Sequence, residues 1–417
     1  MLRTALSACA SISIATLLFA ASFKIRFGAS EAVVLYAPVL VLGACTLVAN
    51  ALDRRHLGRR VRTASLFMLI VAVALYTFFL GGLQQSEMFG RILINCTIGF
   101  LIAVYPWNRR SLSMLLLAFV AYACVLALNT LAIYDSLGSR RGYDEEIREG
   151  YLNVTFAAAI GSICALYRLI ERLGVVNVAA FALTWVGTAL SLGRGALLFG
   201  AFVSLLYLLF ALSTRLSTMG RPKKLMIVAL FLVTGSVAFY QAMSVERTAQ
   251  RMAVLFGDAE GTAGVGGRFE VYGAALDTYF ESPIFGNGMG AYLGDSVSSV
   301  GYPHNVVLQY LVDAGLIGGA VITFFLAANF YLLWTSLRRS GPDTRNLVLA
   351  SGALYLFMVL SYMKSHDAYR GLELFLLSAI PMATYAAQAR LAPHRGRSRR
   401  RVRRRSRGLD LHRAGVG

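Results

Sequence analysis

Charged residues are scarce in this sequence of 417 residues. Asp, Glu, Lys and Arg together make up 15% of it, whereas 57% is hydrophobic and the mean hydropathy is +0.62. A soluble domain of this length carries far more charge, so the composition excludes an ordinary water-soluble fold. Apolar runs of about 18 to 25 residues, long enough to cross a hydrocarbon core, recur along almost the whole chain. The sequence therefore predicts an all-α, polytopic membrane protein.

Cysteine is also rare, and its placement excludes a disulfide framework. All five cysteines lie inside apolar runs, where they act as small hydrophobic residues: Cys9, Cys45, Cys96, Cys124 and Cys164. The sequence has no Cys and His spacing typical of zinc and no Asp-x-Asp pair, and the acidic run Asp144–Glu146 stands in a separate loop. We therefore expect chemistry that needs no metal or other cofactor.

Twelve apolar segments have the length of a transmembrane helix. They are 5–22, 31–52, 63–82, 90–106, 111–134, 151–171, 174–192, 195–213, 225–243, 306–335, 346–363 and 371–389. We expect one transmembrane domain over residues 1–390, with a long loop at about 244–304 between the ninth and tenth helices. The first segment resembles a signal peptide, and a retained first helix is the favoured interpretation because no good cleavage site is evident.

Basic residues indicate how the helices are oriented. Loops after even-numbered helices, such as "DRRHLGRRVR" and "TRLSTMGRPKK", are richer in Lys and Arg than the longer loops between them. The positive-inside rule therefore predicts that both termini and these loops are cytoplasmic. The tail 391–417 is strongly basic and is expected to be disordered. Its position beyond the last helix favours a topology anchor that touches anionic membrane lipid over a nucleic-acid site.

The long loop carries its own pattern. Phe269, Tyr272, Leu276 and Tyr279 follow each other at spacings of three and four, which predicts a short amphipathic helix. A cluster of Gly and Pro from 283 to 294 then predicts turns. We expect this loop to form a lid over the outer helix ends.

Three basic groups lie at predicted outer helix ends, where the positive-inside rule disfavours them. They are Arg194 in "SLGRGALL", Arg268 in "GGRFE" and His304 in "YPHN". Each alone has an ordinary explanation: a snorkelling side chain, a solvated loop charge and a helix cap. Together, beside one elaborate loop, they favour an anionic ligand. Arginine can hold phosphate oxygens bidentately, and a positioned histidine can accept a proton.

These residues resemble a known family. "HN" at 304–305, nine residues and then "GLIG" is similar to the His-[Asn/Ser/Gln]-x9-Gly-x-x-Gly pattern of bacterial O-antigen ligases. "GGRFEVYGAALDTYFESPIFGNGMGAY" resembles the Arg…Pro-x-x-Gly-x-Gly segment of the wider O-antigen ligase and polymerase superfamily, and "SLGRGALL" its Ser-x-x-Arg-Gly element. The match covers about residues 194–319. It implies a GT-C-class glycosyltransferase in the Gram-negative inner membrane with a periplasmic active site.

The resemblance also implies substrates and residue roles. The donor would be a polysaccharide on undecaprenyl pyrophosphate, and the acceptor a sugar hydroxyl of the lipid A core. His304 matches the proposed general base, and Arg194 and Arg268 match pyrophosphate-binding arginines. Transfer would invert the anomeric carbon without a covalent intermediate or a metal.

Several further polar residues are secondary candidates. Lys364 and Asp367 lie between the last two helices, and Tyr302 and Asn305 can orient His304, although Asn305 equally fits a helix cap. Gly315 and Gly318 are expected to let another helix pack closely behind the one that follows His304. Gln84, Glu87 and Arg91 are expected to be ordinary loop residues, as are His366 and Arg370.

Three other functions stay open at this stage. An O-antigen polymerase uses the same donor with a carrier-linked acceptor, and a protein O-oligosaccharyltransferase transfers the same sugars to protein. A transporter of the same lipid would need the arginines but no base. The spacing of nine residues between His304 and the Gly-x-x-Gly motif favours the ligase.

Overall fold

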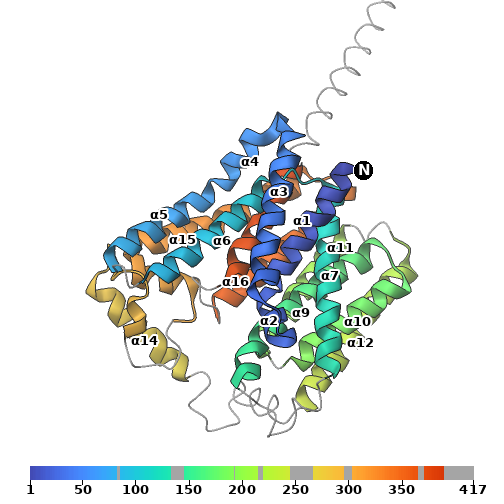
Figure 1. Cartoon of the computed structure of the whole chain (residues 1–417). Helices are drawn as coiled ribbons and strands as arrows, with labels where there is room; N and C mark the ends of the chain where they lie inside the picture. The colour runs from blue at the N-terminus through green and yellow to red at the C-terminus, as the bar shows by residue number, and fades with distance from the viewer. Residues whose placement is uncertain are drawn as a thin grey trace, which may run out of the picture.

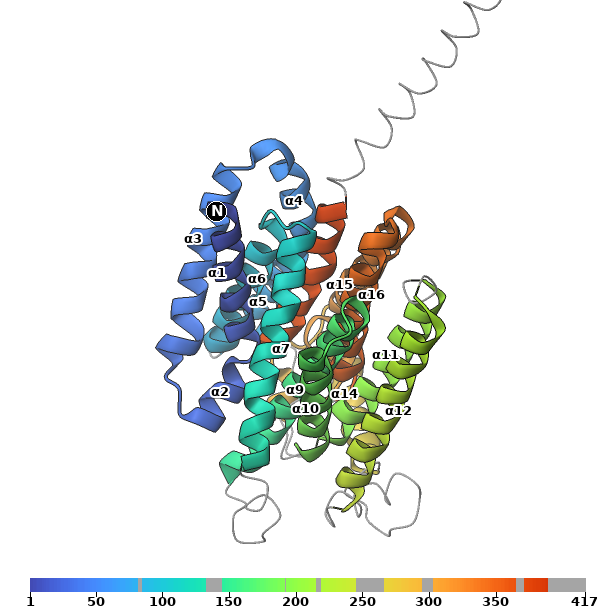
Figure 2. The ribbon, with the colours of Figure 1, turned by 90° about the vertical axis from the view of Figure 1, so that its right-hand side faces the viewer.

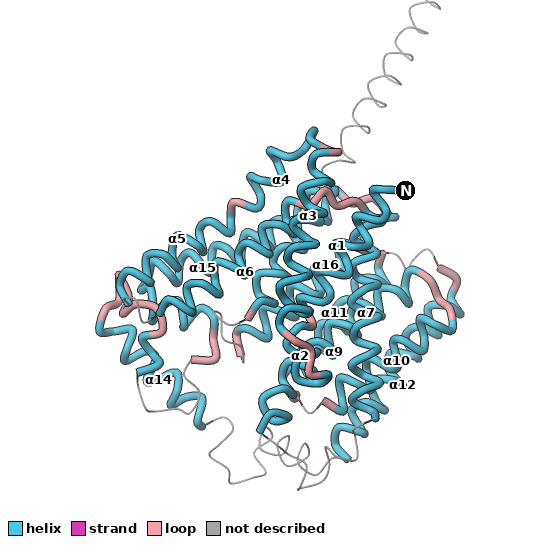
Figure 3. The backbone as a smooth tube through the Cα atoms, viewed as in Figure 1, coloured by secondary structure: helices cyan, strands magenta, loops and turns pink. Residues whose placement is uncertain are grey.

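A computed structural model describes residues 1–81, 85–132, 145–191, 193–214, 219–244, 266–294, 303–364 and 371–388, with the backbone alone at some positions, including Arg194 and 266–270. The regular elements of these ranges are helices, and no strand occurs among them (Figure 3). The all-α prediction is confirmed.

The helices of the N-terminal half are α1 (Leu2–Leu18), α2 (Ala20–Phe27), the π-helix η1 (Ala32–Tyr36), α3 (Ala37–Ala51), the 3₁₀-helix η2 (Arg54–His56), α4 (Leu57–Ala64), α5 (Leu66–Gly81), α6 (Ser86–Val104), α7 (Arg109–Ala132) and α9 (Glu145–Glu171). The C-terminal half contains α10 (Val175–Leu190), α11 (Arg194–Ser213), α12 (Arg221–Ser244), α14 (Gly266–Glu281), the 3₁₀-helix η5 (Ala291–Gly294), α15 (Val306–Arg339), α16 (Pro342–Tyr362) and a helix over 372–388.

A helix stands at each of the twelve predicted segments. Within the described ranges, nine candidate spans are long and apolar enough to cross a membrane, and α1 and α10 are shorter apolar helices. The chain is therefore a multi-pass membrane protein. Its likeness to the GT-C class stays a prediction.

The connections that follow the even-numbered predicted helices lie together at one end of the bundle. We call it the basic end, because these connections are rich in Lys and Arg. There Arg3 donates to the Leu52 carbonyl (2.9 Å), and Glu171 accepts from Asn346 (2.8 Å). The N-terminus and the tops of α3, α7 and α16 share this end in both ribbon views (Figures 1 and 2). At the opposite end, α14 lies across the ends of α5 and α15. Which end faces the cytoplasm stays a prediction.

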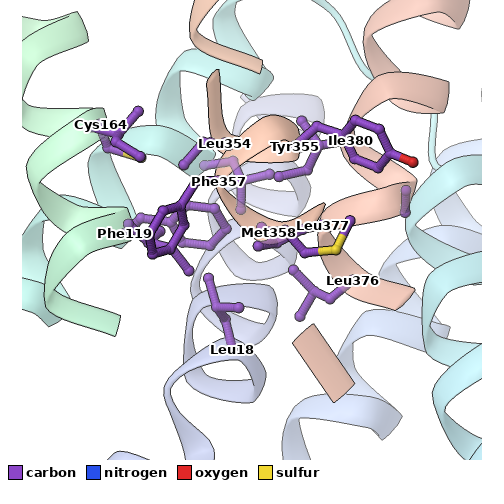
Figure 4. Close-up of a cluster of buried hydrophobic side chains, with 14 of the residues drawn as sticks. Leu18, Phe119, Cys164, Leu354, Tyr355, Phe357, Met358, Leu376, Leu377 and Ile380 are labelled. Atoms are coloured by element: carbon purple, nitrogen blue, oxygen red, sulfur yellow. The ribbon is translucent and has the colours of Figure 1, made fainter. Parts of the chain in front are cut away.

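The core lies where α9, α16 and the helix over 372–388 meet. Large apolar side chains from these helices interlock with residues of α1 and α7, and Figure 4 shows part of this cluster around Phe357 and Met358. α9 is the most enclosed candidate span, with 89% of its most apolar window buried, whereas α12 has 22%. The segment that holds Thr155 is therefore central, and α12 is peripheral.

Small residues bring three helices close together. A Cβ at Gly161 of α9 would lie 2.0 Å from the Cβ of Ala123 on α7, and one at Gly187 of α10 would lie 2.5 Å from that of Ala127. In a bilayer, where apolar burial contributes little to helix association, such close backbone packing supplies much of the attraction. This packing fixes α10, and with it the turn that leads to Arg194.

Candidate active site

The segment before α15 begins with an unusual backbone. His304 has φ 54°, the only positive φ of a residue other than glycine within the described ranges, and its side chain is partly exposed. A left-handed residue other than glycine costs about 1–3 kcal/mol, and such strain concentrates at functional sites. Asn305 then caps α15, because its Oδ1 accepts hydrogen bonds from the backbone N–H groups of Val307 (3.0 Å) and Leu308 (3.1 Å). The capping interpretation of Asn305 is confirmed.

Asn305 also ties the start of α15 to the end of α16. Its Nδ2 donates to the carbonyl oxygen of Met363, the residue that closes α16, at 3.4 Å. Lys364 follows directly, and its Nζ lies 5.4 Å from the centre of the Phe199 ring on α11. A Cβ placed on Gly195 would lie 3.1 Å from that Nζ, so Gly195 leaves room for the ammonium group at the first turn of α11.

A buried threonine shapes the turn before Arg194. Thr155 of α9 donates its hydroxyl to the Ser191 carbonyl (2.8 Å) and accepts from the Gly193 N–H at 3.1 Å. A Cβ on Gly193 would lie 2.4 Å from the Thr155 Oγ1, so glycine is required at this close approach. The turn ends in Arg194, the first residue of α11. These bonds fix Ser191 and Gly193 of the Ser-x-x-Arg-Gly element directly before the helix that Arg194 begins.

These contacts join three helix ends. The N-terminus of α11, with Arg194, meets Lys364 after α16, and Asn305 connects that same helix end to His304. Helix N-termini carry a partial positive charge, to which Lys364 and Arg194 add full charges. Such an arrangement is complementary to a phosphate-bearing ligand.

The Pro-x-x-Gly-x-Gly segment docks on a break in α15. Gly315 has φ 61° and ψ −156°, which interrupts the helix. The Leu316 N–H donates to the Pro283 carbonyl (2.8 Å) instead of to its own helix, and the freed Asp313 carbonyl accepts from the Gly288 N–H (3.0 Å). The loop therefore satisfies the backbone groups that the break leaves open.

Glycine is needed on both sides of this junction. A Cβ at Gly286 would lie 2.4 Å from the Asp313 carbonyl oxygen, and one at Gly315 would lie 2.3 Å from the Ile284 carbonyl oxygen. A Cβ at Gly318 would meet the Tyr310 carbonyl of its own helix at 2.5 Å. The prediction that Gly315 and Gly318 admit another helix is wrong, because Gly315 meets the loop and Gly318 the preceding turn.

The docked loop also reaches α5. The Met289 N–H donates to the Thr77 carbonyl (3.1 Å), and the Tyr76 hydroxyl donates to the Phe285 carbonyl (2.9 Å). The Asp313 carboxylate, which is 2% exposed, accepts from the Gly290 N–H (3.1 Å). The loop is thus fastened to both α5 and α15.

The loop helix α14, whose third residue is Arg268, is held against α15. Val271 and Ala275 are buried against Val312 of α15 and Tyr292. Tyr272 and Tyr279 of the predicted apolar face pack partly against this cluster, whereas Leu276 is 42% exposed. The predicted helix is confirmed, but the face that it buries is rotated toward Val271 and Ala275.

The candidate residues separate into three groups. His304, Asn305 and Lys364 are joined to the backbone at Arg194 by the contacts above. The side chains of Arg194 and Arg268 lie outside the described part, so their convergence on His304 stays a prediction. Tyr302 and Asp367 lie outside the described residues, as do Gln84, His366 and Arg370. Glu87 pairs with Arg91 at 2.5 Å on an exposed helix face, as expected of ordinary surface residues.

Sequence reasoning missed two polar contacts around this site. Thr155 was hidden because a threonine in an apolar run is common, and its partners lie 36 and 38 residues away. Glu373 accepts from the Tyr362 hydroxyl (3.1 Å) beside the end of α16. The sequence offered one sign of this contact, because a carboxylate just inside an apolar segment is expected to have a polar partner.

Within the described residues, no group of three or more His, Cys, Asp or Glu side chains is placed to hold a metal ion. The expectation of a reaction without a metal stays a prediction, which chelation can test.

The comparison with protein families matches the segment that builds this site. Residues 179–323 match the family model described as O-Antigen ligase. The match begins within α10 and ends within α15, so it contains Arg194, Arg268 and His304 as well as the loop and its junction with the broken helix. The comparison with curated proteins found no match. Residues 179–323, about a third of the chain, are therefore similar to the O-antigen ligase family.

Proposed function

We propose that this protein is an O-antigen ligase. It transfers O-antigen polysaccharide from undecaprenyl pyrophosphate to a sugar hydroxyl of lipid A-core, at the periplasmic face of the Gram-negative inner membrane. The family match supports an enzyme of the ligase and polymerase type that acts on a lipid-linked polysaccharide. The observation that carries the finer proposal is the chain of contacts from the start of α11 through Lys364 and Asn305 to His304.

The chemistry follows from the groups at these helix ends. His304 takes the proton of the acceptor hydroxyl as its oxygen attacks the anomeric carbon of the donor sugar. The bond between that carbon and the pyrophosphate oxygen breaks, and its electron pair leaves with the pyrophosphate. Arg194 and Arg268 hold the pyrophosphate and stabilise the charge that develops on it. Attack from the face opposite the leaving group inverts the anomeric carbon.

Lys364 is a third cation for the donor. Its ammonium lies against Gly195, one residue from Arg194, at the end of the helix whose dipole also favours an anion. An anion bound here would meet the Lys364 ammonium and the N-terminal end of α11 together. We therefore include Lys364 in the donor site. Tyr302, Asn305 and Asp367 are secondary candidates for orienting His304 or the acceptor.

Transfer by the purified protein tests this proposal. With defined donor and acceptor, product should form in the presence of EDTA, and Arg194→Ala and Arg268→Ala should each raise the donor concentration needed. Arg91→Ala, which removes a surface ion pair on α6, is the matched control and should leave donor use unchanged. Loss of product on chelation would overturn metal independence, and unchanged kinetics in both variants would remove the pyrophosphate role.

Deletion of the gene separates the ligase from its alternatives. A ligase mutant keeps long chains on the lipid carrier and loses them from lipid A-core, whereas a polymerase mutant retains core that bears a single repeat. A protein O-oligosaccharyltransferase mutant would retain complete lipopolysaccharide and lose sugars from protein. A transporter would yield no product in the purified assay, whichever variant is used.

A further inference from the structure

A charged pocket lies at the basic end, far along the helices from His304. It has a volume of about 420 Å³, and the described residues that line it are Arg109, Arg110, Ser113, Met114, Leu117, Tyr167, Arg168 and Glu171. The first five belong to the start of α7 and the last three to the end of α9. The ligase reaction proposed above uses none of them.

The lining of this pocket carries excess positive charge. It includes three arginines and one carboxylate. The Glu171 carboxylate already has two partners, since Oε1 accepts from Asn346 (2.8 Å) and Oε2 lies 3.4 Å from the guanidinium of Arg109, another lining residue. Among the ion pairs within the described ranges, none includes Arg110 or Arg168. The pocket therefore presents two guanidinium groups that its own carboxylate does not neutralise.

Arg168 is the more buried of these two arginines, so its charge is the more costly to remove from water. It lies near the C-terminal end of α9 and is partly buried, and the one hydrogen bond of its side chain to a described residue is a 3.5 Å contact from Nη1 to the Ser113 hydroxyl. Its Nε is buried and has no hydrogen-bond partner within the described part of the chain. An arginine in such a place is expected to face a counter-charge. An anion in the pocket would supply one.

The pocket changes from charged to apolar along α7. Arg110, Met114 and Leu117 follow each other at spacings of four and three, so they share one face of the helix. Arg110 is exposed at the helix start, and Leu117, two turns further toward the bilayer centre, is 45% exposed. A ligand that fits this face has an anionic head at the level of Arg110 and Arg168 and an apolar chain beside Leu117.

We propose that this pocket binds an anionic glycerophospholipid of the leaflet at the basic end. The lipid phosphate lies between Arg110 and Arg168, and an acyl chain follows Met114 and Leu117. Basic pockets between transmembrane helices are a recognised way of holding anionic head groups. A soluble phosphate would satisfy the arginines but leave the apolar wall unused, and for this reason the pocket favours a lipid.

The test is native mass spectrometry of the purified full chain with added lipid. Phosphatidylglycerol and phosphatidylcholine with identical acyl chains are compared in wild type, Arg110→Gln and Arg168→Gln. We expect preferential retention of phosphatidylglycerol, with each variant lowering its binding about fivefold and leaving phosphatidylcholine unchanged. Lys223→Gln is the matched control, because Lys223 is an exposed cation at the same end on α12 and outside the pocket.

Three outcomes would overturn the proposal. They are equal retention of the two lipids by wild type, an equal loss in Lys223→Gln, and displacement of phosphatidylglycerol by free glycerol phosphate, which would assign a soluble ligand instead. Because Arg110 is exposed at the start of its helix, Arg110→Gln decides the matter even if Arg168→Gln does not fold.

Discussion

At the residue scale, one hydroxyl group holds the turn that begins α11. Thr155 bonds both the Ser191 carbonyl and the Gly193 N–H, and Arg194 is the next residue along the chain. We predict that Thr155→Val lowers the free energy of unfolding by about 1–3 kcal/mol, since it leaves a buried donor unsatisfied, and that it weakens donor use. Thr155→Ser, which keeps the hydroxyl, should retain most of both.

A second threonine provides the control for this prediction. Thr130 of α7 is equally buried, but among the described residues its hydroxyl bonds only the Leu126 carbonyl of its own helix, at 2.9 Å. Thr130→Val should therefore change thermal stability little and leave transfer intact. Equal behaviour of the Thr155→Val and Thr130→Val variants in thermal melts and transfer assays would contradict the role of Thr155.

Residue types single out the charged candidates but not the residues that position them. Arg194, Arg268 and His304 stood out because charge is rare near a membrane, and Asn305 because it precedes an apolar helix. Thr155 did not, since its function depends on a contact across α9 and α10 that no local pattern encodes. The left-handed backbone of His304 was likewise invisible, because nothing in "YPHN" requires it.

At the element scale, the broken helix α15 and the docked loop form one unit. Gly315 is left-handed, and the Ile284 carbonyl lies where its side chain would be. The φ of 61° with ψ −156° at Gly315 lies in a region that is essentially restricted to glycine. We therefore predict that Gly315→Ala destabilises the protein by about 1–3 kcal/mol from the backbone alone, with more from the collision, and abolishes most transfer. Thermal melting in detergent and the transfer assay measure both effects.

Gly235 of α12 is the matched control for this substitution. A Cβ there meets nothing within 4 Å, so Gly235→Ala should keep activity and gain up to about 1 kcal/mol of helix propensity. If Gly315→Ala melts and reacts like Gly235→Ala, the docked junction does not support the site.

Apolar patterning predicted the helices but not this junction. The segment 306–335 has the composition of one continuous span, and the structure indeed has a helix over Val306–Arg339. The break at Gly315 depends on backbone partners about 30 residues upstream, which hydropathy does not report. The sequence contains the Gly-x-x-Gly motif, but the reason for glycine at position 315 is the contact with the docked loop, which only the structure shows.

At the scale of the whole molecule, the alternation of basic connections predicts the orientation. The connections at the basic end are richer in arginine and lysine than those at the other end, where α14 lies. We predict that alkaline phosphatase, which is active only in the periplasm, is inactive when fused after Gly174 and active when fused after Glu281. The reverse pattern would place His304 on the cytoplasmic side and contradict a periplasmic active site.

The central claim is that His304 acts as the general base, and the transfer rate of a His304 variant tests it most directly. His304→Gly is the most informative change, because glycine accepts φ 54° without strain, so lost activity cannot be assigned to backbone strain. We predict a rate about 10²- to 10⁴-fold below wild type, with donor binding and thermal stability retained. A His304→Gly protein that transfers at the wild-type rate would contradict the account.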